Sequence, residues 1–301
     1  MRHANENHGI RIMLAALFTG LPALAQSITI NINDPRPVSV LAQKIEELSG
    51  KPINYEDVRY DNSADIKDIA DSIMTPAQRS QAAVGLHVLV PVGGSMSVTI
   101  TVDPATQRLI DTLSVTNALS TLVAAANSSP NLPGRYRVES YNDGFYIVPT
   151  QQRSVTGAFI SATPVLSVPI TLNGGEATAW EALKAILLQV SQAAGIKVDI
   201  GTVPIKLFAT SKVALSASSE PAYRVLSRLF APISNGVSAL PSGGAPTLSY
   251  SLLFDPKMRF YALNVHVVQG PSKTQDPPPA PTLLPVPNPS KFYNIGSKKG
   301  L

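Results

Sequence analysis

Hydrophobic and polar residues alternate at the start of the folded part of the chain, and then the period changes. Ser27–Ile32 carries isoleucine at every second position, which predicts a strand with one buried face. In Val38–Leu48 the apolar residues fall three or four positions apart, which predicts an amphipathic helix. Gly50 supplies a left-handed helix end, and Pro52 prevents the helix from resuming. A second strand is therefore predicted at Ile53–Tyr55.

The pattern continues with more strands and a second helix. Leu86–Pro91 and Met96–Val102 have strand patterns, and Leu113–Asn127 carries an apolar stripe at helical spacing. Arg135–Pro149 predicts a β-hairpin, because the sequence Asn142-Asp143-Gly144 supplies the residues that a tight turn between strands requires.

Residues 61–85 interrupt this order of elements. Ile66, Ile69 and Ile73 share one helical face, while four aspartates fall on other faces. A calcium loop needs a tight turn with a glycine among its ligands, and no glycine lies among these aspartates, so they indicate a solvated helix face. The segment predicts a helical insertion lying on the domain.

The second half of the chain repeats the order of the first. A strand, a helix, a return strand, a further strand, a second helix and a closing hairpin are predicted at Ser167–Leu172, Thr178–Gly195, Lys197–Val203, Lys212–Ala217, Ser219–Phe230, Ser249–Phe254 and Arg259–Val268. Gly195 repeats the helix-ending role of the first glycine cap. This correspondence predicts an internal repeat. We therefore predict an α+β fold with two tandem small domains, each a mixed β-sheet with two α-helices packed on it, at residues 26–150 and 165–269, joined by a polar linker at 151–164.

Several of these stretches resemble the STN domain, the short N-terminal periplasmic module of secretins and TonB-dependent transporters. The resemblance rests on Ile28–Tyr55, on Ser97–Val102, on the helix around Asn117-Ala118-Leu119, and on the ending Asn142–Pro149. The insertion at 61–85 and the absence of a barrel sequence downstream depart from the family. The resemblance implies a βαβ-βαββ order in each of two copies. It also implies binding to envelope proteins, such as an outer-membrane channel, a transporter or an inner-membrane signalling protein.

The two ends of the chain differ from the middle. In residues 1–25, basic residues precede an apolar run that ends in Ala-Leu-Ala, which predicts a cleaved signal peptide and a periplasmic or secreted protein. An uncleaved membrane anchor is the alternative, but Gly20 and Pro22 interrupt a run shorter than the roughly 20 residues that a span needs. No membrane span is expected after cleavage. Residues 270–301 are proline-rich and predict an extended, disordered tail, or else a tether or short ligand motif for a partner.

Charge and reactive side chains narrow the classes of function. The formal net charge of +4 is spread along the chain and does not predict binding to nucleic acid. Without cysteine the chain has no disulfides, no thiolate catalysis and no cysteine-ligated metal. His87 and His266 each lie inside a strand pattern, which leaves little material for a histidine-based catalytic or metal site. We expect no cofactor, no metal and no catalytic activity.

The predicted hairpin is the best candidate surface for a partner. We expect that a partner adds a strand to an exposed sheet edge there. The candidate residues are Tyr136, Val138, Tyr141, Phe145, Tyr146 and Ile147. Two alternatives stay open. One is an envelope hydrolase or polysaccharide-processing enzyme with carboxylates between the domains, drawn from Glu46-Glu47 or from Asp103 and Asp111; the other is a structural or adhesive envelope component. The sequence does not predict the oligomeric state.

Overall fold

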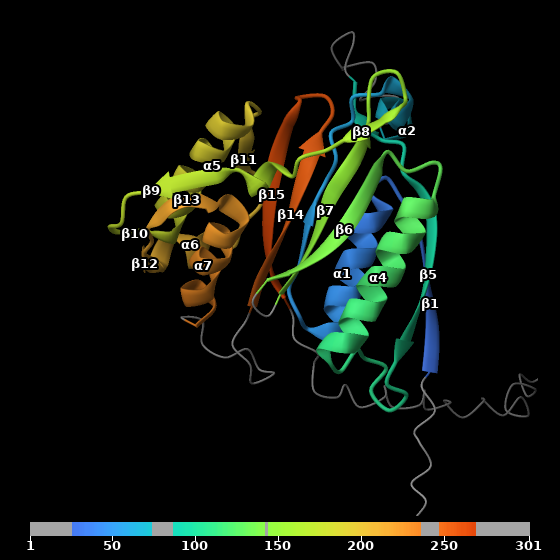
Figure 1. Ribbon diagram of the computed structural model, residues 1–301, viewed down its shortest axis with the longest axis horizontal. Coiled ribbons are helices and arrows are strands. Elements are labelled where there is room, and N and C mark those ends of the chain that lie inside the picture. Colours follow the sequence, from blue (N-terminus) through green and yellow to red (C-terminus); the bar gives the residue numbers. More distant parts are fainter. Residues whose placement is uncertain (1–25, 74–86, 142–143, 236–246, 269–301) are drawn as a thin grey trace, which may run out of the picture.

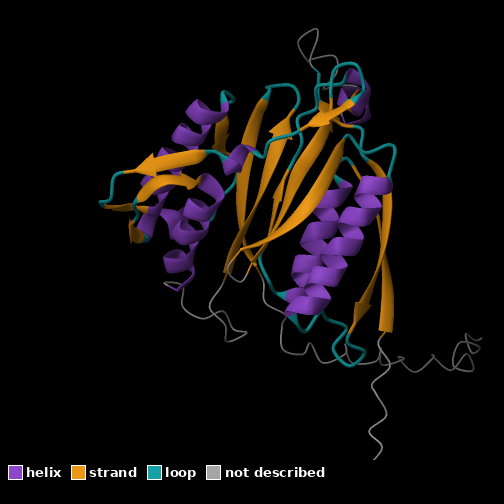
Figure 2. Ribbon diagram, viewed as in Figure 1, coloured by secondary structure: helices purple, strands orange, loops and turns teal. Residues whose placement is uncertain are grey.

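The structure is a computed structural model that describes residues 26–73, 87–141, 144–235 and 247–268. Helices pack against several sheets (Figure 1, Figure 2), which confirms the predicted α+β class. Within the described ranges, no helix is both long and apolar enough to cross a membrane. The predicted signal peptide at 1–25 and the predicted tail at 270–301 lie outside the described residues.

Seven strands of the described residues form one central sheet. From one end to the other it contains β11 (Val198–Ile200), β15 (Phe260–Val268), β14 (Thr247–Asp255), β2 (Ile53–Glu56), β7 (Gly144–Arg153) and β6 (Gly134–Tyr141), and β8 (Phe159–Ser161) pairs with β7. The pairs β6–β7, β7–β8 and β14–β15 are antiparallel, and the pairs β2–β7, β2–β14 and β11–β15 are parallel. Strands from both halves of the sequence therefore belong to one sheet.

Short two-stranded sheets accompany the central one. They pair β1 (Gln26–Asp34) with β5 (Gly94–Val102), β9 (Pro169–Leu172) with β13 (Ala217–Pro221), β10 (Glu176–Thr178) with β12 (Lys212–Ala214), and β3 (Ile66–Asp68) with β4 (Leu89–Pro91), all antiparallel. The first two pairs hold matching positions in the two halves. In each half the first strand, β1 or β9, pairs with the strand that precedes the second long helix, β5 or β13. The strand that follows the first long helix, β2 or β11, runs parallel to the last strand of a hairpin, β7 or β15.

The long helices cover the central sheet from opposite sides. They are α1 (Pro37–Ser49) and α4 (Thr112–Ser128) in the first half, and α5 (Ala179–Ala194) and α7 (Ala222–Asn235) in the second, with the short helix α6 (Ile205–Thr210) beside them. Figure 1 shows α1 and α4 between the central sheet and the β1–β5 ribbon, and α5 and α7 on the other side. Their buried residues recur every three or four positions, as an amphipathic helix requires. As the sequence predicts, Gly50 and Gly195 end α1 and α5 in the left-handed conformation, each at φ 64°.

The two halves meet where β14 runs beside β2. Ser251 is opposite Tyr55 in this pair, and Leu252 is opposite Glu56. The main-chain N–H of Asp57 donates to the carbonyl oxygen of Leu252 at 2.9 Å. Buried side chains from both halves belong to one continuous hydrophobic core. The central sheet and the hydrophobic core therefore both contain residues from the two halves of the chain.

The helix predicted within residues 61–85 is interrupted in the part that the structure describes. Ser63–Asp65 forms a single 3₁₀ turn, Ile66 begins strand β3, and only Ala70–Ile73 is an α-helix, α2. Asn62 and Asp68 explain the breaks, because their side chains accept main-chain N–H groups two residues further on and so compete with helical hydrogen bonds. Residues 74–86 lie outside the described residues.

The segment expected as a linker, residues 151–164, contains strand structure. β7 continues to Arg153, and β8 returns antiparallel to it, so that Gln151 is opposite Ser161. Val165 and Leu166, which follow directly, are buried in the core. The polar composition of this segment reflects strands with one solvent-exposed face.

Candidate functional site

The hairpin residues predicted to bind a partner are mostly buried. Four of the six are at most 5% exposed: Tyr136, Phe145, Tyr146 and Ile147. Only Val138 and Tyr141 are partly exposed. Strand β7 has β6 on one side and β2 and β8 on the other. The hairpin strand β7 therefore has no free edge at which a partner could add a strand in this conformation.

Strand β6 does lie at an end of the sheet, but its first part is capped. The side chain of Asn127 in α4 accepts the N–H of Tyr136 at 2.8 Å and donates to its carbonyl oxygen at 2.9 Å. These are the hydrogen bonds that a neighbouring strand would make at this position. Asn127 thus protects the edge of β6 from strand addition at Tyr136.

The opposite end of the sheet, β11, borders an apolar groove. The groove has a volume of about 810 Å³ and lies between β11 and α5. Its apolar lining residues are Trp180, Ala185, Leu187, Leu188, Val198, Ile200, Val203 and Ile205. Leu188 and Ile205 are 60% and 67% exposed, which is unusual for large aliphatic side chains that lie together.

The main chain of β11 has one strand neighbour, β15, among the described residues. On its outer side, the hydroxyl of Ser191 accepts the N–H of Val198 at 2.8 Å and donates to the carbonyl oxygen of the same residue at 3.2 Å. The N–H of Ile200 donates to the carboxylate of Asp199 at 2.9 Å. Short side chains therefore occupy donors that a neighbouring strand would otherwise use. In the first half, the carboxylate of Glu46 accepts the N–H of Ile53 in the same way at 2.7 Å.

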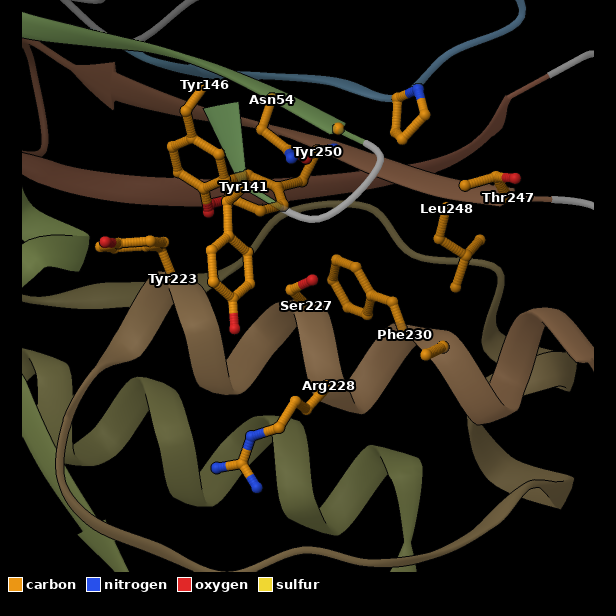
Figure 3. Close-up of a pocket in the computed structure, with 13 residues that line it drawn as sticks. Asn54, Tyr141, Tyr146, Tyr223, Ser227, Arg228, Phe230, Thr247, Leu248 and Tyr250 are labelled. Atoms are coloured by element: carbon orange, nitrogen blue, oxygen red, sulfur yellow. Dashed lines mark hydrogen bonds between the residues drawn. The ribbon is translucent and has the colours of Figure 1, made fainter. Parts of the chain in front are cut away.

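A second concave site lies where the two halves meet. This cavity of about 600 Å³ lies between α7 and the ends of β2, β6, β7 and β14. Its aromatic residues, called here the tyrosine cavity, are Tyr141, Tyr146, Tyr223, Phe230 and Tyr250. Figure 3 shows Tyr223, Ser227 and Phe230 rising from the helix towards Tyr141, Tyr146 and Tyr250 on the strands. Tyr146 contacts the rings of Tyr223 and Tyr250, with centroids 5.1 and 5.5 Å away.

Two hydroxyl groups of the tyrosine cavity lack a hydrogen-bond partner among the described residues. They belong to Tyr146 and Tyr250, which are 3% and 1% exposed. A buried polar group without a partner costs about 1–3 kcal/mol. Burial raises the pKa of Tyr250 well above its usual value, and the neighbouring charge of Glu56 adds to this. The hydroxyl of Tyr250 therefore stays protonated and can donate a hydrogen bond to an acceptor.

Two adjacent acids lie inside the junction, Glu56 and Asp57, which are 1% and 0% exposed. The carboxylate of Glu56 accepts the main-chain N–H groups of Val165 and Leu166. Burial raises the pKa of Glu56 to about 8, although these two hydrogen bonds act in the opposite direction. Because both acids are enclosed by the core, a substrate cannot reach them in this conformation, and their hydrogen bonds act within the protein.

Asp57 is the centre of a buried polar network. Its carboxylate accepts hydrogen bonds from the guanidinium of Arg36 at 2.8 Å, from the hydroxyl of Tyr60 at 2.7 Å and from the hydroxyl of Tyr55 at 3.0 Å. The hydroxyl of Tyr55 is also 3.2 Å from that of Tyr136. Burial and the charge of Asp57 raise the pKa of Tyr136. The network therefore consists of neutral hydroxyls around a paired carboxylate.

Each acid considered for an enzyme is bound to a partner other than a second acid. Glu46 bonds to His266 at 2.5 Å, and Glu47 pairs with Lys44 at the surface. Asp103 accepts hydrogen bonds from the hydroxyl of Thr106 and from N–H groups of the same turn, which lower its pKa, and Asp111 caps the start of α4. No cluster of three or more potential metal-ligating side chains is found in the described part of the chain.

Comparison with family models, with curated proteins and with solved structures gives no match for this chain. The geometry of the groove and of the tyrosine cavity is therefore the basis for assigning a function.

Sequence reasoning missed the residues that matter most in both sites. Leu188 lies directly after Leu187, outside the apolar stripe of its helix. A large apolar residue outside the stripe indicates an exposed binding surface, so Leu188 could be found from the sequence. Tyr223 gave no such signal, because only the junction brings it beside Tyr141 and Tyr146.

Proposed function

We propose that the protein is a non-catalytic interaction module of the cell envelope that binds a partner protein by extending its central sheet at β11. The partner contributes an extended, apolar segment whose side chains enter the groove beside α5. We further propose that the chain is exported to the periplasm and consists of two STN-like domains in tandem. In that setting it acts as an adaptor in a secretion, uptake or signalling assembly.

The observation that carries this proposal is the junction between β2 and β14. Strands β2 and β11 hold matching positions, because each follows a carbonyl that accepts an N–H from the parallel hairpin strand beside it. The N–H of Phe145 in β7 donates to the carbonyl of Pro52 at 3.0 Å, and the N–H of Tyr261 in β15 donates to the carbonyl of Lys197 at 2.9 Å. In the first half, a parallel strand, β14, extends the sheet at β2. The matching position beside β11 has no strand in the described part of the chain. The chain thus contains an internal example of the interaction that we propose.

The groove supplies the chemistry for selecting a partner. Strand addition gains affinity from main-chain hydrogen bonds and selectivity from pockets for alternate side chains. Leu188 lies seven residues before its helix-ending glycine, and Gln43 holds the same place in α1. A polar residue is therefore compatible with this helix position, and the fold does not require an exposed leucine there. Exposed apolar side chains that lie together are typical of interaction sites.

The tandem-domain part of the proposal is supported by the shared pairing scheme. Each half has an antiparallel strand pair, two helices in contact, and a parallel pair that ends in a hairpin. Location in the periplasm rests on residues 1–25, and the family resemblance rests on the sequence stretches given above.

A photo-crosslinking amino acid placed at Ile205 tests this function in cells that produce the protein. Ile205 lines the groove and is exposed, so the substitution leaves the core unchanged. We expect a crosslinked envelope protein, identified by mass spectrometry. Adding Leu188→Asp should abolish that crosslink, because an extended apolar segment will not bury a carboxylate. Ala124 on the exposed face of α4 serves as the control position. Equal crosslinking from Ile205 and Ala124 would contradict the proposal.

A further inference from the structure

We propose that the tyrosine cavity binds the proline-rich segment of the same chain, Pro277–Pro289, as an internal ligand. This inference does not depend on the proposed function, because it concerns a different site and a different ligand. The segment reads PPPAPTLLPVPNP and follows the last described strand after a short connection. It is the only stretch of this composition in the sequence.

The lining of the tyrosine cavity suits a proline-rich ligand. Proline-rich segments adopt an extended helix without internal hydrogen bonds, so their carbonyl groups remain available as acceptors. Proteins bind such segments in grooves lined by aromatic rings. The tyrosine cavity offers four tyrosines and a phenylalanine from both halves of the chain (Figure 3). Tyr141 and Tyr223 meet edge to face, with ring centroids 5.9 Å apart, and both are partly exposed.

Two buried hydroxyls of the tyrosine cavity need a hydrogen-bond partner. Tyr146 and Tyr250 both line the cavity, both are more than nine-tenths buried, and neither hydroxyl has a partner in the described ranges. Buried hydroxyls are normally hydrogen-bonded. A ligand that brings carbonyl oxygens into the cavity would supply the missing acceptors. An entirely apolar ligand would leave both hydroxyls without partners.

The proline-rich segment begins a short distance along the chain from the tyrosine cavity. Val268 is the last described residue, and it is paired with Thr247, which lines the cavity. Residues 269–276 separate Val268 from the proline-rich segment. Fully extended, they reach about 26 Å, at roughly 3.3 Å per residue. A short connection of this kind also gives the segment an effective concentration in the millimolar range, so that modest affinity is sufficient for binding.

Charge agrees with this assignment. Asp276 directly precedes the first proline of the segment. Arg224 stacks on Tyr141 and Tyr223, with its guanidinium carbon 5.3 and 5.8 Å from the two ring centroids, and its side chain is exposed. Arg228 also lines the cavity, but its guanidinium is paired with Glu220. The acidic end of the segment would therefore meet Arg224.

The absence of cysteine in the chain allows a disulfide test in the full-length protein. One cysteine replaces Ser227 in the cavity lining, and a second replaces Thr282 in the middle of the segment. Under mild oxidation we expect a disulfide within one chain, seen as faster migration of the monomer on a denaturing gel. The control protein carries Thr282→Cys with Ala124→Cys on α4, far from the junction, and should form little of this product.

Further substitutions test whether the rate of disulfide formation depends on the proposed contacts between the tyrosines and the prolines. Tyr141→Ala with Tyr223→Ala should lower the rate of disulfide formation by about tenfold, as should replacement of Pro277–Pro279 by serine. Unchanged melting temperatures would show that these variants remain folded. Three results would overturn the proposal: equal rates for the Ser227 and Ala124 pairs, disulfides only between chains, or rates that do not respond to the serine replacements.

Discussion

The main-chain N–H of Asp57 donates to the carbonyl oxygen of Leu252 at 2.9 Å, and this hydrogen bond joins the two halves of the chain into one sheet. The carboxylate of the same aspartate holds Arg36, Tyr55 and Tyr60. A buried polar network therefore lies at the position where the first half accepts a strand from the second. The stability of the protein should depend on this network. Partner binding should depend on the matching position in the second half, beside which the described residues place no strand.

Asp57→Ala should lower the free energy of unfolding by roughly 3–5 kcal/mol, because the guanidinium of Arg36 loses its paired carboxylate and the buried hydroxyl of Tyr60 loses its acceptor. Urea unfolding measures the effect. Glu47→Ala is a suitable control, because Glu47 pairs with Lys44 at 2.6 Å but both side chains are about half exposed. Its removal should change stability by about 0.5 kcal/mol or less. Similar losses in the two variants would show that the buried network is not the stabilising element.

Stability should fall as the pH rises from 5 to 9. The pKa of Glu56 is about 8 in the folded protein, above its usual value of 4.5, so folding favours the protonated carboxyl. The stabilisation is fully present below the unfolded pKa and is lost as the pH rises through the folded pKa. The loss should be roughly 3–5 kcal/mol in urea unfolding experiments. In Glu56→Gln the side chain cannot ionise, so its free energy of unfolding should vary much less over this range; an equal pH dependence would exclude Glu56 as the cause.

Two neighbouring leucines should behave differently. Leu187 is 3% exposed and Leu188 is 60% exposed. Leu187→Ala should cost 2–5 kcal/mol, as is usual for a buried leucine, estimated roughly from cavity formation. Leu188→Ala should change thermal stability by about 0.5 kcal/mol or less, while reducing the crosslink from Ile205. Loss of stability in Leu188→Ala comparable to that in Leu187→Ala would mean that Leu188 belongs to the core and not to a binding site.

Gly195→Ala should destabilise the protein by about 1 kcal/mol, through backbone conformation alone. The residue has φ 64°, and an added Cβ would meet no atom within 4 Å, so a steric clash is excluded. Gly175 is the matched control, because it also has open space around it but no positive φ. Calorimetry should show a lower melting temperature for Gly195→Ala only. Equal decreases in melting temperature in the two variants would show that the positive φ of Gly195 is not the cause of the destabilisation.

Patterns in short stretches of the sequence predict those elements whose structure depends on residues close together in the chain. The glycines that end α1 and α5 were predicted because a left-handed helix end favours glycine, and the hairpin strands were predicted from their alternation. The interruption of the helix predicted in the insertion was missed because isoleucines at helical spacing conceal the competing side-chain hydrogen bonds of Asn62 and Asp68.

The sites depend on contacts between segments that are distant in the sequence. Tyr146 was predicted to face a partner, but Tyr223 and Tyr250 from the second half cover it. No periodicity indicates that β14 pairs with β2, or that β11 remains at the end of the sheet. Leu188 alone left a local sign, as a large apolar residue on the polar side of its helix.

The central claim is that partners bind at the β11 end of the sheet and not at the β6 end. The most direct measurement compares photo-crosslinking in cells from Ile205, in the groove, with crosslinking from Arg137, which is exposed on β6. We predict a specific envelope protein crosslinked from Ile205, and only the background of the Ala124 control from Arg137. Capture from Arg137 without capture from Ile205 would contradict the claim and would assign partner binding to the hairpin edge.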